Sequence, residues 1–325
     1  MLMSSRRALL SGAGAIVAAL LASAASAQDY PSRNVRVIVG FTAGSGPDVI
    51  ARAVSTQLSA DLKQTFYVQN IVGANGTLAI KTLLGSPADG YNILYSSSSI
   101  SPVPYFYKNT GFDVLKDLAP IATSGILDGN FMLVHPSLPV HNVKEFIEYA
   151  KKNRVLYGSP GVGNGLHLST ELFNVKAGLK MEHVPFRGAS DVTTALLNGS
   201  IQVMFVTPPS VLSLVQAGTL RAIGFSGSKP FPEAPDVPLI KDTLPSYPVI
   251  GSWGMFFAPV NTPPTIVDSL NRAIRASLRA PAVANVVQKS GYVPDERSPA
   301  ETAAFFAREV EATGEAVRAA NIKPE

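Results

Sequence analysis

The chain contains no cysteine among its 325 residues. This absence excludes disulfide bonds, thiolate catalysis and cysteine-ligated zinc together. Charged residues make up only 15% of the sequence, below the roughly 25% that is usual for soluble domains, and the formal net charge is +4. There is no basic run and no interleaving of basic with aromatic residues, so nucleic acid is not expected as a partner.

Catalytic motifs are also missing from the sequence. The four histidines form no H-E-x-x-H motif, and neither G-x-S-x-G nor G-x-x-x-x-G-K-[ST] occurs. His167 and Glu171 are spaced i, i+4, which usually indicates a contact on one helix face. We find no base paired with a nucleophile, and we expect no catalytic residues, no metal and no cofactor.

A long apolar run occurs only near the N-terminus. Residues 1–27 have a positively charged start, an apolar stretch at Ala13–Ala22 and an A-x-A cleavage pattern at Ala25–Ala27. The apolar stretch falls short of the ~20 residues that a membrane-spanning helix needs. We therefore interpret residues 1–27 as a signal peptide that is cleaved after Ala27, which places the mature chain in the periplasm. Ser5–Leu10 also fits the twin-arginine export signal, so both export routes stay open.

Short apolar runs alternate with helical patterns along the rest of the chain. Ile50, Val54, Leu58 and Leu62 recur at i+4 and form one apolar stripe. The alternation predicts an α/β fold with largely parallel sheets. The candidate strands are 35–40, 66–69, 91–95, 131–135, 155–158, 182–186, 201–206, 220–225 and 253–258.

Two stretches are predicted to carry the chain between two bodies. They are 119–131 and 229–252, and the second contains six prolines, which argues against continuous regular structure. If both are crossovers, residues 28–126 plus 249–325 form lobe 1 and residues 127–248 form lobe 2. A cleft between two such lobes is a usual place for a small-molecule site.

Residues 41–48 read FTAGSGPD and join a predicted strand to a predicted helix. Gly44 and Gly46 permit backbone conformations that bring amides close to a ligand. Ser45 and Asp48 have the spacing of a capping box. A helix start leaves about four N–H groups unpaired and carries about +0.5 elementary charge. The pattern predicts an anion site built from backbone amides, and a tight turn without a ligand is the alternative.

A second strand–helix junction repeats this pattern. Ser159, Gly161 and Gly163 form the turn, and Asn164 is predicted to cap the following helix. With one such turn in each lobe, the two helix starts would hold a carboxylate from both sides. Another glycine-rich connector is the alternative.

Two further stretches bear polar side chains after predicted strands. Arg187 would either pair with a carboxylate ligand or form an interdomain salt bridge. Ser96 and Ser97, the first serines of the run YSSSSIS at 95–101, would either contact a ligand or form a solvated loop. The sequence leaves both choices open.

The mature chain resembles the solute receptors of tripartite tricarboxylate transporters, also called Bug receptors. The resemblance covers nearly all of the mature chain, and its markers follow one another at family-like spacing. These markers are YPSRNVRVIVGFTAGSGPDVIAR, VQNIVGANG, SPADGYNILYSS, GVGNGLHLSTELF, HVPFRGA, LLNGSIQVMF, AGTLRAIGFSGSKPFPEAPDVPLI and WGMFFAPVNTPPTIVDSLN.

The resemblance implies a type II periplasmic-binding-protein fold whose two lobes close on a small organic carboxylate. It also implies a monomeric receptor that delivers the ligand to membrane permease subunits. A ligand sensor for a signalling partner and a periplasmic enzyme are the alternatives. The ligand-binding positions that it implies are Phe41, Thr42, Ala43, Gly44, Ser45, Gly46, Asp48, Ser159, Gly161, Gly163, Asn164, His167, Arg187 and Gly188.

The chain departs from the family pattern at several positions. The second of two adjacent glycines in the first loop is Ser45, and the usual Y-K-G reads Phe186-Arg187-Gly188. Acidic residues that are often found further on correspond to Ala195, Gln202 and Val206. Losing acids near a pocket makes it more tolerant of anions. These departures leave the identity of the ligand open.

Overall fold

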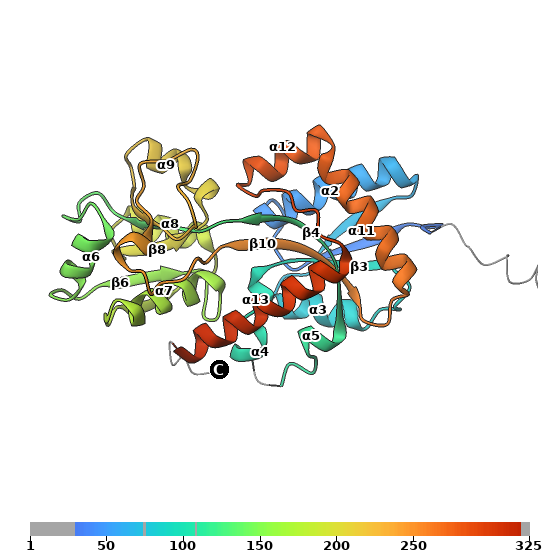
Figure 1. The fold of residues 1–325 in the computed structure, drawn as a ribbon, viewed down its shortest axis with the longest axis horizontal. Helices are drawn as coiled ribbons and strands as arrows, with labels where there is room; N and C mark the ends of the chain where they lie inside the picture. The colour runs from blue at the N-terminus through green and yellow to red at the C-terminus, as the bar shows by residue number, and fades with distance from the viewer. Residues whose placement is uncertain (1–29, 74–75, 108, 320–325) are drawn as a thin grey trace, which may run out of the picture.

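Two five-stranded sheets, each covered by helices, organise the structure (Figure 1). The computed structural model describes residues 30–73, 76–107 and 109–319. The predicted signal peptide and its cleavage site lie outside the described residues. The α/β fold class predicted from the sequence is confirmed.

Lobe 1 is the body built on the sheet with strand order β2-β1-β3-β10-β4. Its strands are β1 (Val35–Val39), β2 (Phe66–Asn70), β3 (Asn92–Ser97), β4 (Leu118–Leu127) and β10 (Ser252–Pro259). Its helices are α2 (Gly46–Leu62), α3 (Thr77–Leu84), η2 (Ser98–Ile100), α4 (Val103–Phe106), α5 (Val114–Asp117), α11 (Pro264–Arg279), α12 (Pro281–Lys289) and α13 (Pro299–Ala319).

Lobe 2 is the body built on the sheet with strand order β7-β6-β8-β5-β9. Its strands are β5 (Phe131–Val134), β6 (Leu156–Ser159), β7 (Glu182–Pro185), β8 (Val203–Val206) and β9 (Arg221–Phe225). Its helices are α6 (Val143–Ala150), α7 (Gly165–Lys176), α8 (Ala189–Leu197), η3 (Pro208–Ser210), α9 (Leu212–Gln216) and α10 (Ile240–Thr243).

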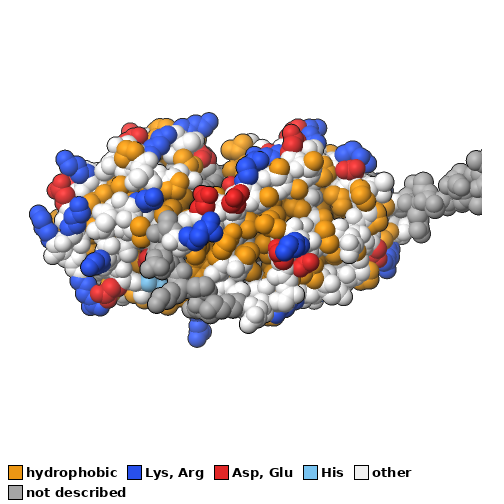
Figure 2. Space-filling model, turned by 60° about the horizontal axis from the view of Figure 1, so that its bottom comes forward, with side chains coloured by type: hydrophobic (Ala, Val, Ile, Leu, Met, Phe, Trp, Pro, Cys, Tyr) orange, Lys and Arg blue, Asp and Glu red, His pale blue; other side chains and the backbone are white. Residues whose placement is uncertain are grey.

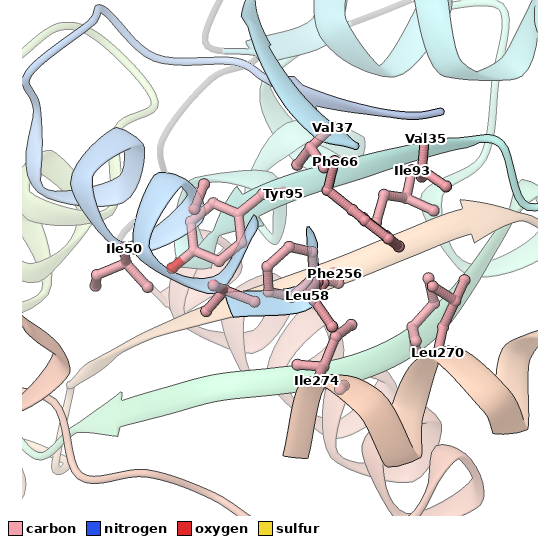
Figure 3. Packing of buried hydrophobic residues seen from close by; sticks show 14 of the residues in the cluster. Val35, Val37, Ile50, Leu58, Phe66, Ile93, Tyr95, Phe256, Leu270 and Ile274 are labelled. Carbon is pink, nitrogen blue, oxygen red and sulfur yellow. The ribbon is translucent and has the colours of Figure 1, made fainter. Parts of the chain in front are cut away.

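Alternate residues of the strands of lobe 1 enter two separate cores. Val37 packs with Ile50 of α2 and Leu270 of α11 on one face of the sheet (Figure 3). Ile38, the next residue along β1, packs with Ile80 of α3 on the opposite face. Because both faces are covered, the strands are continuous apolar runs, and such runs are visible in the sequence.

All nine predicted strands form, each within two residues of its predicted ends. The prediction of largely parallel sheets is wrong, however. The pairs β1·β2, β1·β3, β6·β7 and β6·β8 are parallel. The pairs β10·β3, β10·β4, β5·β8 and β5·β9 are antiparallel. The antiparallel pairs all involve β10 or β5, which are the strands that the chain enters on arriving from the other lobe.

Strand β4 lies where the sequence predicts only a crossover. It contains Pro120 and Gly125, residue types that are rare inside central strands. β4 is an edge strand that pairs with β10 through two register shifts, and an edge tolerates these residues. Together β4 and β10 form two long strands that reach from lobe 1 toward lobe 2 (Figure 1). The chain passes to the sheet of lobe 2 between Leu127 and Phe131.

Helix α13 packs along lobe 1 and reaches α7 of lobe 2 (Figure 1). Phe306 and Val310 enter a core of lobe 1, whereas Val317 packs with Leu168 of α7. Figure 2, in which this side of the molecule comes forward, shows positive and negative side chains intermixed over both lobes. Within the described residues, no helix has the length and apolar character required to cross a membrane.

Candidate functional site

The first loop is shaped by the buried carboxylate of Asp48, which lies in the first turn of α2. It accepts hydrogen bonds from the Gly44 amide at 2.8 Å, from Arg52 Nε at 2.9 Å and from Asn70 Nδ2 at 2.7 Å. Burial alone would raise the pKa of Asp48, but the hydrogen bonds from Arg52, Asn70 and Gly44 hold it below its ordinary value. The carboxylate therefore stays charged and fixes the turn.

The capping box predicted for this loop does not form. Ser45 is the N-cap of α2, but its hydroxyl donates to the Thr42 carbonyl at 2.7 Å and does not cap the helix. The Ser45 amide donates to the same carbonyl at 3.1 Å. Asp48 bonds the amide of Gly44 and not that of Ser45. The acceptor reaches one residue further back than a capping box requires.

In the second turn, as in the first, a side chain four residues after a glycine accepts a hydrogen bond from the glycine amide. Gly163 donates its amide to Nδ1 of His167, four residues on, at 3.2 Å. Asn164 caps α7 as predicted, because its side chain accepts from the Leu166 amide at 2.9 Å. The expectation of unpaired amides is therefore wrong for Gly44 and Gly163, since each has an acceptor four residues further on.

The two turns share one pattern over five positions. They read GSGPD at 44–48 and GNGLH at 163–167. In each, the first glycine has a positive φ, of 80° at Gly44 and 75° at Gly163. The second residue is the N-cap and the fifth is the internal acceptor. The third, Gly46 or Gly165, is the first residue of the helix.

The amides of these first helical residues have no acceptor among the described residues. An amide at the first helical position has no acceptor inside its own helix. Within the described part of the chain, Gly46 and Gly165 have no other acceptor either. An added β-carbon would meet nothing within 4 Å at Gly46 or at Gly165, so both backbones are open on that side.

The two helix starts line a single cavity of about 1070 Å³ between the lobes. Ser45, Gly46 and Pro47 contribute the wall from lobe 1, and Asn164 and Gly165 contribute a wall from lobe 2. Helix starts carry about +0.5 elementary charge each, and their free N–H groups favour anions. The arrangement supplies positive potential to the cavity from two sides without a charged side chain.

The predicted site residues divide into those that line the cavity and those that do not. Phe41, Ser45, Gly46, Ser97 and Asn164 line it. The lining does not include Thr42, Ala43, Gly44, Asp48, Ser96, Ser159, Gly161, Gly163, His167, Arg187 or Gly188. Asp48 and His167 instead accept hydrogen bonds from the amides of the two turns, at Gly44 and Gly163. The residue that follows each of these glycines lines the cavity.

Histidines 167 and 183 stack beneath the second turn, with ring centroids 4.1 Å apart. Burial, with a smaller effect from His183, lowers the pKa of His167 to about 3. Burial lowers the pKa of His183 to about 4. His183 Nε2 lies 2.7 Å from the Ser159 hydroxyl. Glu171 accepts a hydrogen bond from Tyr157 and forms none with His167, so the contact expected at this spacing is not made.

Arg187 and the serines resolve part of what the sequence left open. Arg187 is exposed and forms no salt bridge with a described residue, so the interdomain pair is not formed. Ser96 and Ser97 belong to strand β3 and are buried, so they are not a solvated loop. Gly188 is the N-cap of α8. Among the described residues, no cluster of three or more metal-ligating side chains occurs.

Several cavity residues were missed by the sequence interpretation. Gly165 follows the predicted N-cap and repeats the position of Gly46, so the repeated pattern could have revealed it. Ser98 belongs to the serine run that the sequence interpretation began at Ser96. Ser252 and Tyr292 carry no local signal, because only the fold brings them to the cavity.

The lobes approach each other closely at two glycines. An added β-carbon at Gly163 of lobe 2 would stand 3.0 Å from Cγ of Phe106 in lobe 1. One at Gly291, in the loop after α12, would stand 2.3 Å from Cγ of Pro209 in lobe 2. Both glycines allow the opposite lobe to approach more closely than another residue would.

Two α/β lobes, a pair of connecting strands and a cavity between the lobes are the architecture of periplasmic solute-binding proteins. A family model described as tripartite tricarboxylate transporter family receptor matches residues 50–322, and the chain belongs to this family. Protein BugT of Bordetella pertussis is 32% identical over 319 residues, which cover 95% of each chain. The resemblance inferred from the sequence motifs is confirmed.

Solved structures agree with this assignment. A protein of R. palustris solved with adipate has a TM-score of 0.83 and 29% identity, covering 91% of this chain and 100% of that chain. The periplasmic binding protein BugD has a TM-score of 0.80 and 26% identity, with coverage of 91% and 100%. MatC from Rhodopseudomonas palustris, solved with malate, has a TM-score of 0.79 and 25% identity, with coverage of 89% and 100%.

Proposed function

We propose that the protein is an exported, monomeric receptor that captures a small organic carboxylate and presents it to the membrane permease subunits of a tripartite transporter. One observation carries this proposal: the first residues of two helices, Gly46 and Gly165, face one cavity from opposite lobes with free amides. The ligands of the two R. palustris relatives, adipate and malate, are both carboxylates.

The ligand carboxylate is placed between the two helix starts. The Gly46 and Gly165 amides, with the Ser45 and Ser97 hydroxyls and the Asn164 side chain, are its nearest polar groups in this proposal. Asp48 and His167 act through the shape of the turns, because each accepts a hydrogen bond from a turn amide. Gly44 and Gly163 contribute their positive φ to the turns, since their amides are occupied.

Binding draws the two lobes together. A ligand that contacts both helix starts makes all its contacts only when the lobes are close, and this difference in affinity shifts the population toward the closed form. The lobes are taken to be residues 28–126 plus 249–325 and residues 127–248, so that the chain bends where the two connecting segments meet the sheets. The permease then recognises the closed form.

Isothermal titration of the purified mature chain tests the proposal. Straight-chain mono- and dicarboxylates, citrate and benzoate form the panel, and the corresponding amides form the control set. Binding of at least one carboxylate, with no binding of its amide, is expected. If no carboxylate binds at millimolar concentration, the proposed function is wrong.

Export is tested separately. We propose that the mature chain starts at Gln28 and resides in the periplasm. Intact-mass measurement on the protein released from the periplasm is expected to give the mass of residues 28–325. Retention of the first 27 residues would contradict the proposed cleavage after Ala27.

A further inference from the structure

Three hydroxyl groups form a chain on the cavity wall. The Ser98 and Ser252 hydroxyl oxygens lie 3.0 Å apart, and the Ser252 hydroxyl lies 3.2 Å from the Tyr292 hydroxyl. The residues come from η2, β10 and the loop after α12, separated by 154 and 40 positions in the sequence. All three residues are half-buried and line the cavity.

The hydroxyl chain lies at the same end of the lobe 1 strands as the first loop, namely the carboxyl end of β1 and β3. Ser98 follows β3, which neighbours β1, and Ser252 starts β10, which neighbours β3. Tyr292 precedes Val293, whose backbone exchanges hydrogen bonds with Ile126 near the end of β4. From β1 to β10 is two strand spacings, or about 10 Å. The hydroxyl chain therefore lies where it can contact the far end of a ligand whose carboxylate is held at the first loop.

Proton counting shows what the hydroxyl chain offers a ligand. Three hydroxyl groups carry three protons, and the two internal hydrogen bonds use two of them. One proton is left to donate, while the oxygens keep lone pairs that accept. Burial raises the pKa of Tyr292 above its ordinary value, so its hydroxyl stays protonated. The group suits one uncharged oxygen, which accepts one hydrogen bond and can donate another.

The charges around the cavity do not favour a second carboxylate. The basic residues on its wall are Lys176 and Lys289, and the acidic residues are Asp128, Glu309 and Glu315. No arginine is among the described residues that line it. A second anionic group would thus enter a wall with more acids than bases, with no bidentate partner to compensate.

We propose that the Ser98–Ser252–Tyr292 hydroxyl chain is a specificity site for the far end of the ligand, and that the ligand is a monocarboxylate with a hydroxyl or carbonyl group at that end. This inference rests on the proposed function, since it assumes that the carboxylate binds at the helix starts. With C–C bonds of about 1.5 Å, a ligand of about six carbons spans the gap.

Three six-carbon ligands test the inference: hexanoate, 6-hydroxyhexanoate and adipate. They share one carboxylate and one chain length, and they differ only in the far group. The corresponding five- and seven-carbon acids, hydroxy acids and diacids are titrated in parallel, because the best ligand length is set by the cavity. In the best-fitting set, the hydroxy acid is expected to bind about five- to tenfold more tightly than the plain acid, as one neutral hydrogen bond would give. The dicarboxylate is expected to bind most weakly.

The triple substitution Ser98→Ala, Ser252→Ala and Tyr292→Phe removes all three hydroxyl groups and keeps the tyrosine ring. It is expected to abolish the preference for the hydroxy acid and to leave the affinity for hexanoate unchanged. Ser290→Ala is the matched control, because Ser290 also lines the cavity but its hydroxyl donates to the Val286 carbonyl at 2.9 Å. The control should keep the full preference.

Each outcome distinguishes the inference from the proposed function. If the wild type binds plain acids but prefers dicarboxylates, or has no preference for hydroxy acids, the inference is wrong and the receptor function stands. A preference that persists in the triple variant also contradicts it. If the triple variant does not fold, at least one of its three single substitutions must lower the preference. If no acid of any length binds, the proposed function fails as well.

Discussion

Residue 46 illustrates how one backbone position supplies a site without a reactive side chain. Gly46 begins α2, lines the cavity and has an amide without an internal acceptor in the described part of the chain. Gly44, two residues earlier, is also a glycine but has a different role, because its amide donates to Asp48. The sequence of the loop predicts that both glycines belong to the site. Only the position of the Asp48 carboxylate shows that the Gly44 amide is occupied and the Gly46 amide is not.

The substitution Gly46→Pro tests whether this amide binds the ligand. Proline is common at the first helical position, and open space surrounds the site of the added β-carbon, so the helix should persist. Removing one donor from a carboxylate is expected to cost about 1.5–3 kcal/mol of binding free energy. Gly46→Ala is the control, since it adds a β-carbon before Pro47 but keeps the N–H. Equal affinity of the two variants in titration would show that the amide is not used.

The histidine stack predicts how stability depends on pH. The pKa of His167 is about 3 in the fold, against about 6.5 in an unfolded chain. Below pH 6.5 the unfolded chain therefore binds more protons at this site. The stabilisation is complete above pH 6.5 and decreases as the pH falls toward 3, by up to about 1.4 kcal/mol per pH unit.

Urea unfolding between pH 7.5 and 4 measures this dependence. His167→Gln removes the titrating ring, and its side-chain oxygen can still accept from the Gly163 amide. The variant should show a smaller slope of unfolding free energy against pH than the wild type. His141→Gln is the control, because His141 lies on the surface beside Glu145. An unchanged slope in His167→Gln would contradict the assigned pKa shift.

At the scale of secondary structure, local sequence predicts elements but not their partners. The apolar runs of β1 and β8 stand out because both of their faces are buried. Strand β4 does not stand out, since Pro120 and Gly125 interrupt it and long-range pairing with β10 decides its conformation. The antiparallel direction of β10 follows from its return from lobe 2, and no local pattern encodes that return.

A substitution in the loop after α12 should change how closely the two lobes can approach. Gly291→Ala places a β-carbon 2.3 Å from Pro209, so the two lobes must separate or the loop must shift. The same variant strains the backbone, because Gly291 has a φ of 77°. Gly218→Ala is the control, with a φ of 70° and no atom within 4 Å of the added β-carbon.

Both glycine variants should lose roughly 1–2 kcal/mol of folding stability from the left-handed backbone. Only Gly291→Ala is expected to weaken ligand binding as well, by about tenfold, because its lobes close less completely. Thermal unfolding and titration together separate the two effects. If Gly218→Ala weakens binding equally, strain alone accounts for the change and the contact with Pro209 has no role in closure.

At the scale of the whole molecule, the position of the cavity depends on how the two lobes are joined. The sequence predicts two bodies, and it predicts a glycine turn before a helix in each. It does not show that Gly46 and Gly165 line one cavity, because they lie more than 100 residues apart and the two lobes that carry them are joined through β4 and β10. Family resemblance supplies this arrangement, whereas periodicity and spacing do not.

Closure predicts a link between stability and shape that neither lobe would show alone. A ligand present at 100 times its Kd raises the free energy of unfolding by about 2.7 kcal/mol, whatever the binding geometry. If the ligand contacts both helix starts, the same concentration must also reduce the radius of gyration, measured by small-angle scattering. The Gly46→Pro variant, saturated at a higher ligand concentration, should contract less, because only the Gly165 amide remains to hold the carboxylate. A ligand that stabilises the wild type without reducing its radius of gyration would bind to one lobe only, and α2 and α7 would then not act on one carboxylate.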